Sequence, residues 1–338
     1  MAIPYQGCRR PRPHPHYSSL FLRLPFIMGA LIYVRYCLRT GFYLVTLAFW
    51  GIASTPLSCA FAVLGRRFEA GSLVTRLFSR FVGWALDLRV EFDGAEHLTT
   101  QPAVFMLNHQ SALDIWLLGR FDPLSLLRPA CPIFTRDPLN RSFPKRVSVM
   151  AKKSLGWSPL GPVLYLSGCI LVERGTGGRS VASMRKAGTT LREAGVSLVV
   201  FPEGTRNGAR TPTLLPFRKG GFHMAVQSGM PIVPIVCENY SHMYRFGYFE
   251  PVPLKARVLP PIPTAGLGVE DVPALTIKVQ QQMLEAVRDI SRPARARFPT
   301  LSTRLGTSVS LDIKCWQEVL LNSTSIAGHL IEKVRDKS

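Results

Sequence analysis

The sequence predicts an α/β protein, in which a mixed, largely parallel sheet is flanked by helices and preceded by N-terminal membrane helices. Two observations support this fold class. Short apolar runs rich in β-branched residues alternate with helical patterns after residue 100, and a long uncharged segment lies near the N-terminus. In proteins built this way, function resides in the loops at the strand ends.

The N-terminal region contains 25 uncharged residues, 41–65, which as a helix would cross a hydrocarbon layer of about 30 Å. A shorter apolar run, 24–34, cannot span by itself and is expected to lie in the interface or to pair with the longer run. Pro56 is a candidate kink. A single span and a hairpin that enters one leaflet both fit, and the alternative is a buried core helix. Arginines flank the long run on both sides, so its orientation is not set.

The charge balance implies an anionic partner. Lys and Arg number 41 against 21 Asp and Glu, a formal net charge of +20, which suits nucleic acid, an anionic membrane surface or a phosphorylated substrate. Charged residues make up only 18% of the chain, fewer than in an average soluble domain. No acidic residue precedes Glu69, so the first forty residues favour an anionic leaflet. No nucleic-acid-binding motif is present, and we expect no nucleic-acid partner.

The elements after residue 100 are predicted from the hydrophobic pattern and from the Gly, Pro and polar residues that bound each apolar run. Apolar runs bounded by Gly, Pro or polar residues predict three strands, at 103–107, 196–201 and 231–236. Helical patterns predict helices at 112–118, 180–193, where Gly195 is a stop signal, and 274–290. After residue 291 the pattern weakens.

The cysteines indicate neither a disulfide framework nor a metal site. There are seven, an odd number, and no two of them form a C-x-x-C pair. We expect reduced thiols and no bound metal. The chain also lacks the P-loop, the dinucleotide fingerprint and the G-x-S-x-G elbow, so no nucleotide cofactor and no serine nucleophile are predicted.

The first candidate for chemistry follows the first predicted strand. His109 lies five residues before Asp114, across a loop-to-helix junction. In such a pair the carboxylate fixes the tautomer of the imidazole, and the second ring nitrogen takes a proton as general base. The same segment also fits a capping box, Ser111-x-x-Asp114, in which the aspartate serves only the helix N-terminus.

The second candidate, Phe-Pro-Glu-Gly-Thr-Arg at 201–206, follows the most hydrophobic predicted strand. Gly204 permits close approach of backbone to a ligand, and Thr205 and Arg206 donate hydrogen bonds suited to phosphate oxygens. Glu203 is a candidate to position Arg206 or a substrate hydroxyl. An ordinary solvated turn fits equally well. Two more basic glycine-rich loops, at Arg174 and at Lys219, fit either anion contacts or simple turns.

In this order and spacing, the motifs resemble those of the lysophospholipid acyltransferases, most closely the fungal-like 1-acylglycerol-3-phosphate acyltransferases. The resemblance covers roughly residues 89–291 together with the hydrophobic N-terminus. The matching segments are NHQSALD at 108–114, AKKSLGWSPLG at 151–161, GCILVER at 168–174, FPEGTR at 201–206, LLPFRKGGFHMA at 214–225 and PIVPIV at 231–236.

The resemblance implies a membrane enzyme that transfers an acyl group from acyl-CoA to the sn-2 hydroxyl of 1-acyl-sn-glycerol 3-phosphate, forming phosphatidic acid. It implies that His109 is the general base and that Asp114 orients it. The residues implied to bind the glycerol phosphate are Arg174, Glu203, Gly204, Thr205 and Arg206, and Lys219 is added as a further anion contact. Acyl-CoA is then a co-substrate, no cofactor is needed and no acyl-enzyme forms. PIVPIV is either a strand that shapes the substrate site or a plain buried strand.

The predicted organisation is a basic segment 1–22, a membrane-associated helical region 23–80, an acyltransferase domain 81–291 with an insertion at 121–142, and a tail 292–338. We expect an endoplasmic reticulum membrane and an active site that faces the cytosol. Two alternatives stay open: the same chemistry on glycerol 3-phosphate or another lysophospholipid, and a non-catalytic basic protein that binds anionic lipid. A hydrolase is disfavoured because neither a nucleophile nor a metal site is recognisable.

Overall fold

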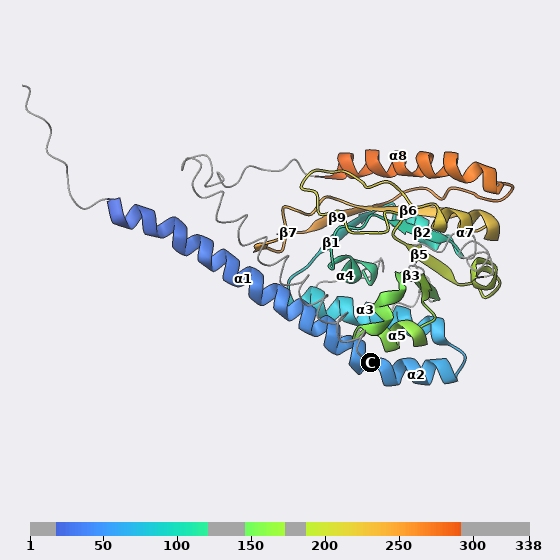
Figure 1. The fold of residues 1–338 in the computed structure, drawn as a ribbon, viewed down its shortest axis with the longest axis horizontal. Coiled ribbons are helices and arrows are strands. Elements are labelled where there is room, and N and C mark those ends of the chain that lie inside the picture. Colours follow the sequence, from blue (N-terminus) through green and yellow to red (C-terminus); the bar gives the residue numbers. More distant parts are fainter. Residues whose placement is uncertain (1–17, 121–145, 173–186, 292–338) are drawn as a thin grey trace, which may run out of the picture. The chain divides into compact units, whose positions relative to one another are not determined.

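The computed structural model describes residues 18–120, 146–172 and 187–291 (Figure 1). Every described element belongs to one compact unit, which lies within Met1–Arg292. The predicted insertion, the loop that contains Arg174 and the C-terminal tail lie outside the described residues.

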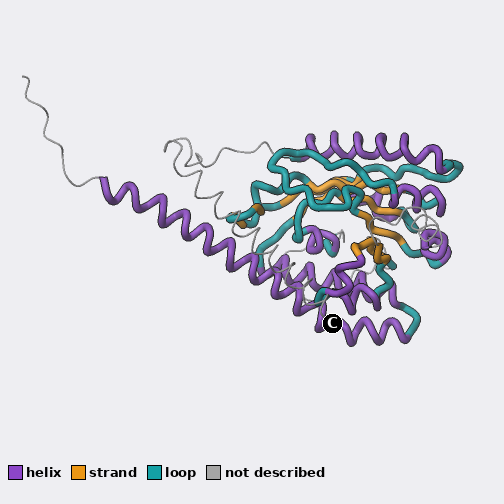
Figure 2. Tube along the Cα trace, viewed as in Figure 1, coloured by secondary structure: helices purple, strands orange, loops and turns teal. Residues whose placement is uncertain are grey.

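A seven-stranded sheet forms the centre of the described unit (Figure 2), in the order β1-β9-β6-β2-β5-β3-β4. The five neighbours from β6 to β4 run parallel to one another, β9 is antiparallel to β6, and β1 is parallel to β9. The predicted mixed, largely parallel sheet is therefore confirmed. Its strands are β1 (Val90–Asp93), β2 (Val104–Leu107), β3 (Val147–Lys152), β4 (Ile170–Val172), β5 (Ser197–Val200), β6 (Ile232–Cys237) and β9 (Leu254–Val258).

Helices cover both faces of the sheet (Figure 1). One face packs against α7 (Gly220–Ser228) and α8 (Val272–Ile290). The other face packs against α3 (Arg67–Ala85) and α4 (Asp114–Leu118), with α1 (Ser18–Ala53), α2 (Thr55–Val63) and α5 (Gly161–Leu166) on the same side. The short elements are η1 (Ala95–Thr99), η3 (Lys153–Trp157), η4 (Val269–Asp271), and the two-stranded hairpin β7 (Tyr244–Arg245) and β8 (Tyr248–Phe249).

Burial on both faces explains why the central strands contain almost only apolar residues. In β2, Phe105 and Leu107 belong to the core on the α3 and α4 side, whereas Val104 and Met106 belong to the core under α7 and α8. Successive side chains of a strand point to opposite faces, so a strand covered on both sides shows a continuous apolar run rather than alternation.

The elements predicted after residue 100 are present with small shifts at their ends. The three predicted strands are β2, β5 and β6, and two of the predicted helices are α4 and α8. The third is helical over residues 187–193, and its earlier part lies outside the described residues. Gly195 ends it in the left-handed conformation, at φ 63°, which a glycine adopts without strain.

The N-terminal helices differ from the expectation of two separate apolar segments. The runs 24–34 and 41–65 are joined, because α1 is continuous for 36 residues and includes Arg35 and Arg39. The helix breaks at Ser54, and Pro56 lies in the first turn of α2, where its missing N–H costs nothing. Among the described residues, Met28–Val63 is long and apolar enough to cross a membrane by length and composition.

One side of α1 packs closely on the rest of the unit. The buried Tyr43 hydroxyl donates to the Ala112 carbonyl at 2.7 Å, and the Trp50 indole N–H donates to the Val74 carbonyl at 3.2 Å. The remaining sides expose apolar residues to the surroundings, among them Leu31, Leu38, Val45, Phe49 and Ile52. The helix is therefore neither a fully buried core helix nor a span free of the sheet domain.

Candidate active site

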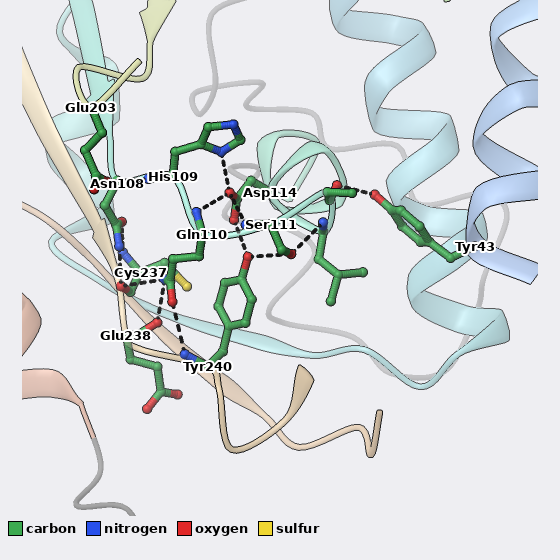
Figure 3. A network of polar contacts seen from close by, with 12 residues as sticks. Tyr43, Asn108, His109, Gln110, Ser111, Asp114, Glu203, Cys237, Glu238 and Tyr240 are labelled. Atoms are coloured by element: carbon green, nitrogen blue, oxygen red, sulfur yellow. Dashed lines mark hydrogen bonds and ion pairs between the residues drawn. The ribbon is translucent and has the colours of Figure 1, made fainter. Parts of the chain in front are cut away.

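The candidate site lies where parallel strands end together. The segments that follow β2, β5 and β6 meet at this edge of the sheet, because parallel strands have their carboxyl ends at the same side (Figure 3). His109 follows β2, Glu203 follows β5 and Tyr240 follows β6. Three parts of the chain that are far apart in sequence thus contribute to one polar network.

His109 and Asp114 are in direct contact. The imidazole Nδ1 is 2.7 Å from Asp114 Oδ2, and the same oxygen accepts hydrogen bonds from the backbone N–H groups of Gln110 and Ser111 at 2.7 and 3.0 Å. The Ser111 hydroxyl in turn accepts from the Leu113 N–H. Asp114 therefore holds the backbone just before α4 and also contacts the imidazole. The Ser111 N–H bond is one half of the predicted capping box, whereas Leu113, the N-cap of α4, receives no side-chain cap.

The surroundings fix the imidazole in one orientation. Asp114 is buried, and its carboxylate can only accept hydrogen bonds, so the imidazole Nδ1 donates to it. This leaves Nε2, on the opposite side of the ring, as the basic nitrogen (Figure 3). The Phe201 ring stacks on the imidazole, with centroids 4.3 Å apart and planes inclined by 30°. This is the arrangement of a general base whose tautomer is set.

Glu203 supports the backbone of His109. Its two carboxylate oxygens accept hydrogen bonds from the N–H groups of His109, at 2.9 Å, and of Leu215, at 2.8 Å. The Asn207 N–H donates to the His109 carbonyl at 2.7 Å, so both polar groups of the His109 backbone are held by the segment after β5. Burial raises the pKa of Glu203, and the backbone hydrogen bonds lower it in part.

This placement of Glu203 differs from the phosphate or hydroxyl contact that the sequence suggested. The carboxylate is buried, both of its oxygens accept from backbone N–H groups, and it does not line the adjoining cavity. A carboxylate beside a phosphate would also repel it. Glu203 holds the loop in position, and the exposed Thr205 and Arg206 are the residues of this segment that reach the cavity.

The loop after β2 is also fastened to the end of β6. The buried Asn108 amide donates to the Cys237 carbonyl and accepts from the Cys237 N–H, at 2.9 and 2.8 Å. The Gln110 amide donates to the Glu238 carbonyl at 2.8 Å and accepts from the Tyr240 N–H at 3.2 Å. Neither residue has a signal of its own in the sequence, although both lie within the His109 motif.

A cavity of about 840 Å³ adjoins His109. Its apolar lining comes largely from α1, α3 and α5, and its cationic side chains come from α3, the end of β3 and the segment between β5 and α7. No carboxylate lines the cavity within the part of the chain that the structure describes. The apolar lining includes Leu47, Trp50, Phe78, Leu160, Val163 and Leu164, and the cationic side chains are Arg76, Lys152, Arg206, Arg218 and Lys219.

The predicted anion-binding residues Gly204, Thr205, Arg206 and Lys219 all line this cavity. Gly204 has a φ of 67°, and an added Cβ would lie 3.1 Å from the Arg218 side chain, so both the turn and the space favour glycine. Arg174 lies outside the described residues. PIVPIV forms the buried strand β6 and contributes nothing to the described lining, which fits the plain buried strand.

The chemistry available here is proton transfer and anion binding. Within the described ranges, no three His, Cys, Asp or Glu side chains are grouped so as to hold a metal ion. His109 presents a basic ring nitrogen, Arg206, Arg218 and Lys219 carry positive charge, and the apolar lining has the character that would bury a hydrocarbon chain.

Comparison with known proteins identifies the family. Residues 89–238 match the family model described as Acyltransferase. Human 1-acyl-sn-glycerol-3-phosphate acyltransferase alpha is 35% identical over 82% of this chain and 91% of its own length. The corresponding enzyme of Saccharomyces cerevisiae is 32% identical over 75% of this chain and 78% of its own length.

A solved structure shares the fold. The crystal structure of the 1-acyl-sn-glycerophosphate acyltransferase from Thermotoga maritima matches 78% of this chain and 99% of its own, with a TM-score of 0.55 at 20% identity. The motifs, the fold and the curated relatives agree, and the resemblance inferred from the sequence is confirmed. The chain belongs to the 1-acyl-sn-glycerol-3-phosphate acyltransferase family.

Proposed function

We propose that the protein transfers an acyl group from acyl-CoA to the sn-2 hydroxyl of 1-acyl-sn-glycerol 3-phosphate and so forms phosphatidic acid. The names of the curated relatives support the acceptor and the reaction. One structural observation carries the proposal. His109, oriented by Asp114, lies at a cavity that combines an apolar lining with cationic side chains, as an amphiphilic phosphate ester requires.

In this reaction, His109 acts on the acceptor alcohol. Nε2 takes the hydroxyl proton as the alcohol oxygen bonds to the thioester carbonyl carbon. The C–S bond then breaks, and the imidazolium returns the proton to the departing CoA thiolate. A thioester is already activated, so no acyl-enzyme is needed, and the tasks left to the protein are deprotonation, alignment and charge stabilisation. Asp114 stabilises the transient imidazolium.

The phosphate is assigned to the cationic side chains of the cavity. Thr205 and Arg206 follow the turn at Gly204, and Lys219 stands at the start of α7. Arginine binds phosphate through paired N–H groups, and lysine acts as a mobile point charge. The hydrocarbon chains are assigned to the apolar lining from α1, α3 and α5, where burial from water stabilises them.

We also propose that the enzyme is attached to the endoplasmic reticulum membrane with its active site facing the cytosol. The exposed apolar residues of α1 support a lipid-facing surface, and Trp157 and Tyr165 extend exposed aromatic surface beside the cavity onto η3 and α5. Protease protection of an epitope tag inserted after Gly208 in sealed microsomes tests the orientation. Digestion without detergent is expected, and protection would contradict a cytosolic site.

The activity is tested with membranes that contain the full chain and labelled acyl-CoA. Lysophosphatidate and glycerol 3-phosphate are offered separately, beside a His109→Ala variant and membranes without the protein. We expect labelled phosphatidate from lysophosphatidate only, and none from the variant. Transfer to glycerol 3-phosphate or to another lysophospholipid alone would replace the proposed acceptor. Salt-dependent lipid binding without transfer, unchanged in His109→Ala, would favour the non-catalytic binding protein.

A further inference from the structure

Tyr240 lies behind the His109–Asp114 pair, on the side away from the imidazole (Figure 3). Its buried hydroxyl donates to Asp114 Oδ1 at 2.6 Å and is 2.9 Å from the Ser111 hydroxyl. The three donors to Oδ2 come from residues 109–111, whereas Tyr240 is 126 positions away in sequence. In the described part of the chain, no other hydrogen bond to Oδ1 is found.

The directions of these hydrogen bonds follow because each hydroxyl, of Tyr240 and of Ser111, has only one proton to donate. The Tyr240 proton is used on Asp114, so the Ser111 hydroxyl must donate to the Tyr240 oxygen. The Ser111 oxygen accepts in turn from the Leu113 N–H at 3.0 Å. A chain of donors therefore runs from the helix backbone through Ser111 and Tyr240 to Asp114, and each bond polarises the next.

Tyr240 is itself fixed by the loop that it supports. Its N–H donates to the Gln110 side chain, and its carbonyl accepts from the N–H groups of Met243 and Tyr244. Its ring belongs to the core that contains Trp116 and Phe249. Burial and the nearby Asp114 raise the pKa of Tyr240 well above its ordinary value, so the phenol stays a neutral donor at the pH of the reaction.

The geometry points to Tyr240 as a positioning residue for the proposed reaction: it holds Asp114 Oδ1 so that Oδ2 faces the His109 imidazole, and it moderates the charge that Asp114 presents to it. This inference rests on the proposed function only in assigning the imidazole the task of base. Tyr240 is not among the described residues that line the cavity.

Removal of the phenol has a defined effect on His109. Without this donor, the negative charge of Asp114 is less delocalised and stabilises the imidazolium form of His109 more. Other titratable and charged groups also face the pair, and a Tyr240→Phe change leaves all of them in place. They are Tyr43 of α1, Asp114 of α4, Glu203 and Arg206 after β5, and Cys237 and Glu238 at the end of β6.

The test compares Tyr240→Phe with Tyr43→Phe in the full-length, membrane-bound chain. Both changes remove one buried hydroxyl that contacts the same loop, but the Tyr43 hydroxyl donates to the Ala112 carbonyl and not to Asp114. The first readout is the pH at half-maximal carbethoxylation of His109, followed by peptide mass spectrometry. This readout needs no acyl transfer, so it decides the inference even where the wild-type chain proves inactive on lysophosphatidate and the proposed function fails.

We expect Tyr240→Phe to raise that pH by on the order of half a unit to one unit, and Tyr43→Phe to leave it unchanged. With lysophosphatidate, kcat of Tyr240→Phe should fall on the order of tenfold with little change in KM, and the acid limb of the pH profile should move upward. An unshifted His109 titration in Tyr240→Phe, or an equal shift in Tyr43→Phe, would overturn the inference.

Ser111→Ala provides a second variant that keeps the tyrosine. It removes the donor to the phenol oxygen, and we expect a smaller upward shift of the His109 titration than in Tyr240→Phe. Where Tyr240→Phe does not fold, a shift in Ser111→Ala supports the inference, and no shift there overturns it.

Discussion

The His109 network and the N-terminal helices are stabilised by different physical means. Around His109, buried polar groups are paired across three chain segments, and each hydrogen bond has one geometry. Along α1, most of the outward surface is apolar. Such a surface is stabilised in an apolar environment by the hydrophobic effect, which does not depend on the direction of individual contacts. The first region should therefore respond to the loss of single atoms, and the second to changes of charge or of its few specific contacts.

The largest effect is expected for Asp114→Asn. An asparagine amide cannot accept all four hydrogen bonds that reach Asp114, and it cannot stabilise an imidazolium by charge. We expect kcat with lysophosphatidate to fall by about 10²–10⁴-fold. The control, Asp87→Asn, changes an exposed carboxylate that pairs with the neighbouring Arg89, and it should keep wild-type activity. Equal activities of the two variants would remove Asp114 from the mechanism.

The lipid-facing side of α1 is tested by Val45→Lys. Val45 is 70% exposed, so a lysine there fits the fold but places a charge against the hydrocarbon. We expect a lysine at the membrane centre to disfavour attachment by about 2.5–3.5 kcal/mol, measured by partition into vesicles. Ile277→Lys, at a 57% exposed apolar position on α8, is the matched control and should partition like the wild type. Comparable losses in both variants would argue against attachment through α1.

Glu203→Gln tests the support of the His109 backbone. Glutamine keeps one acceptor oxygen but turns an amide group toward the other buried N–H, which costs about 1–3 kcal/mol of unfolding free energy. The pH dependence has a definite sign. Burial raises the pKa of Glu203 in the folded state, so the folded state binds more protons, and stability falls as pH rises from the unfolded pKa through the folded one.

Denaturant unfolding of the full chain in detergent at several pH values measures both effects. In Glu203→Gln the decline of stability over that pH window should disappear, since the amide does not titrate. Glu96→Gln, which changes an exposed carboxylate on η1, should keep the wild-type pH dependence. A persistent decline in Glu203→Gln would assign the titration to another group.

The parts of the structure that a local sequence pattern determines are predictable from the sequence. The strands β2, β5 and β6 and the pair His109 and Asp114 are encoded by short contiguous runs, because a buried parallel strand is continuously apolar and its loop follows at once. Tyr240 had no comparable signal. Its contact with Asp114 depends on β2 and β6 being neighbours in the sheet, which no spacing in the sequence reveals.

The backbone contacts of Glu203 and the continuity of α1 lack a local sequence signal for a related reason. A glutamate in a basic, glycine-containing loop suggests a ligand contact, but only the fold shows that two backbone N–H groups need its oxygens. The charges at Arg35 and Arg39 suggested that two apolar segments were separate. In the structure both arginines reach Glu250, which follows β8, so a continuous helix accommodates them beside the sheet domain.

That contact gives the smallest expected effect and defines how α1 is held. Arg39 donates to Glu250 at 2.7 Å and to the Phe249 carbonyl at 2.6 Å, and both charged side chains are mostly covered. A double-mutant cycle with Arg39→Met and Glu250→Gln should give a coupling of about 0.5–1 kcal/mol. The exposed pair Arg89–Asp87, at a similar distance of 2.8 Å, should give a coupling of about zero, because water screens it. A coupling for Arg39–Glu250 no larger than that of the exposed pair would mean that apolar packing alone holds α1, and that its arginines are merely tolerated there.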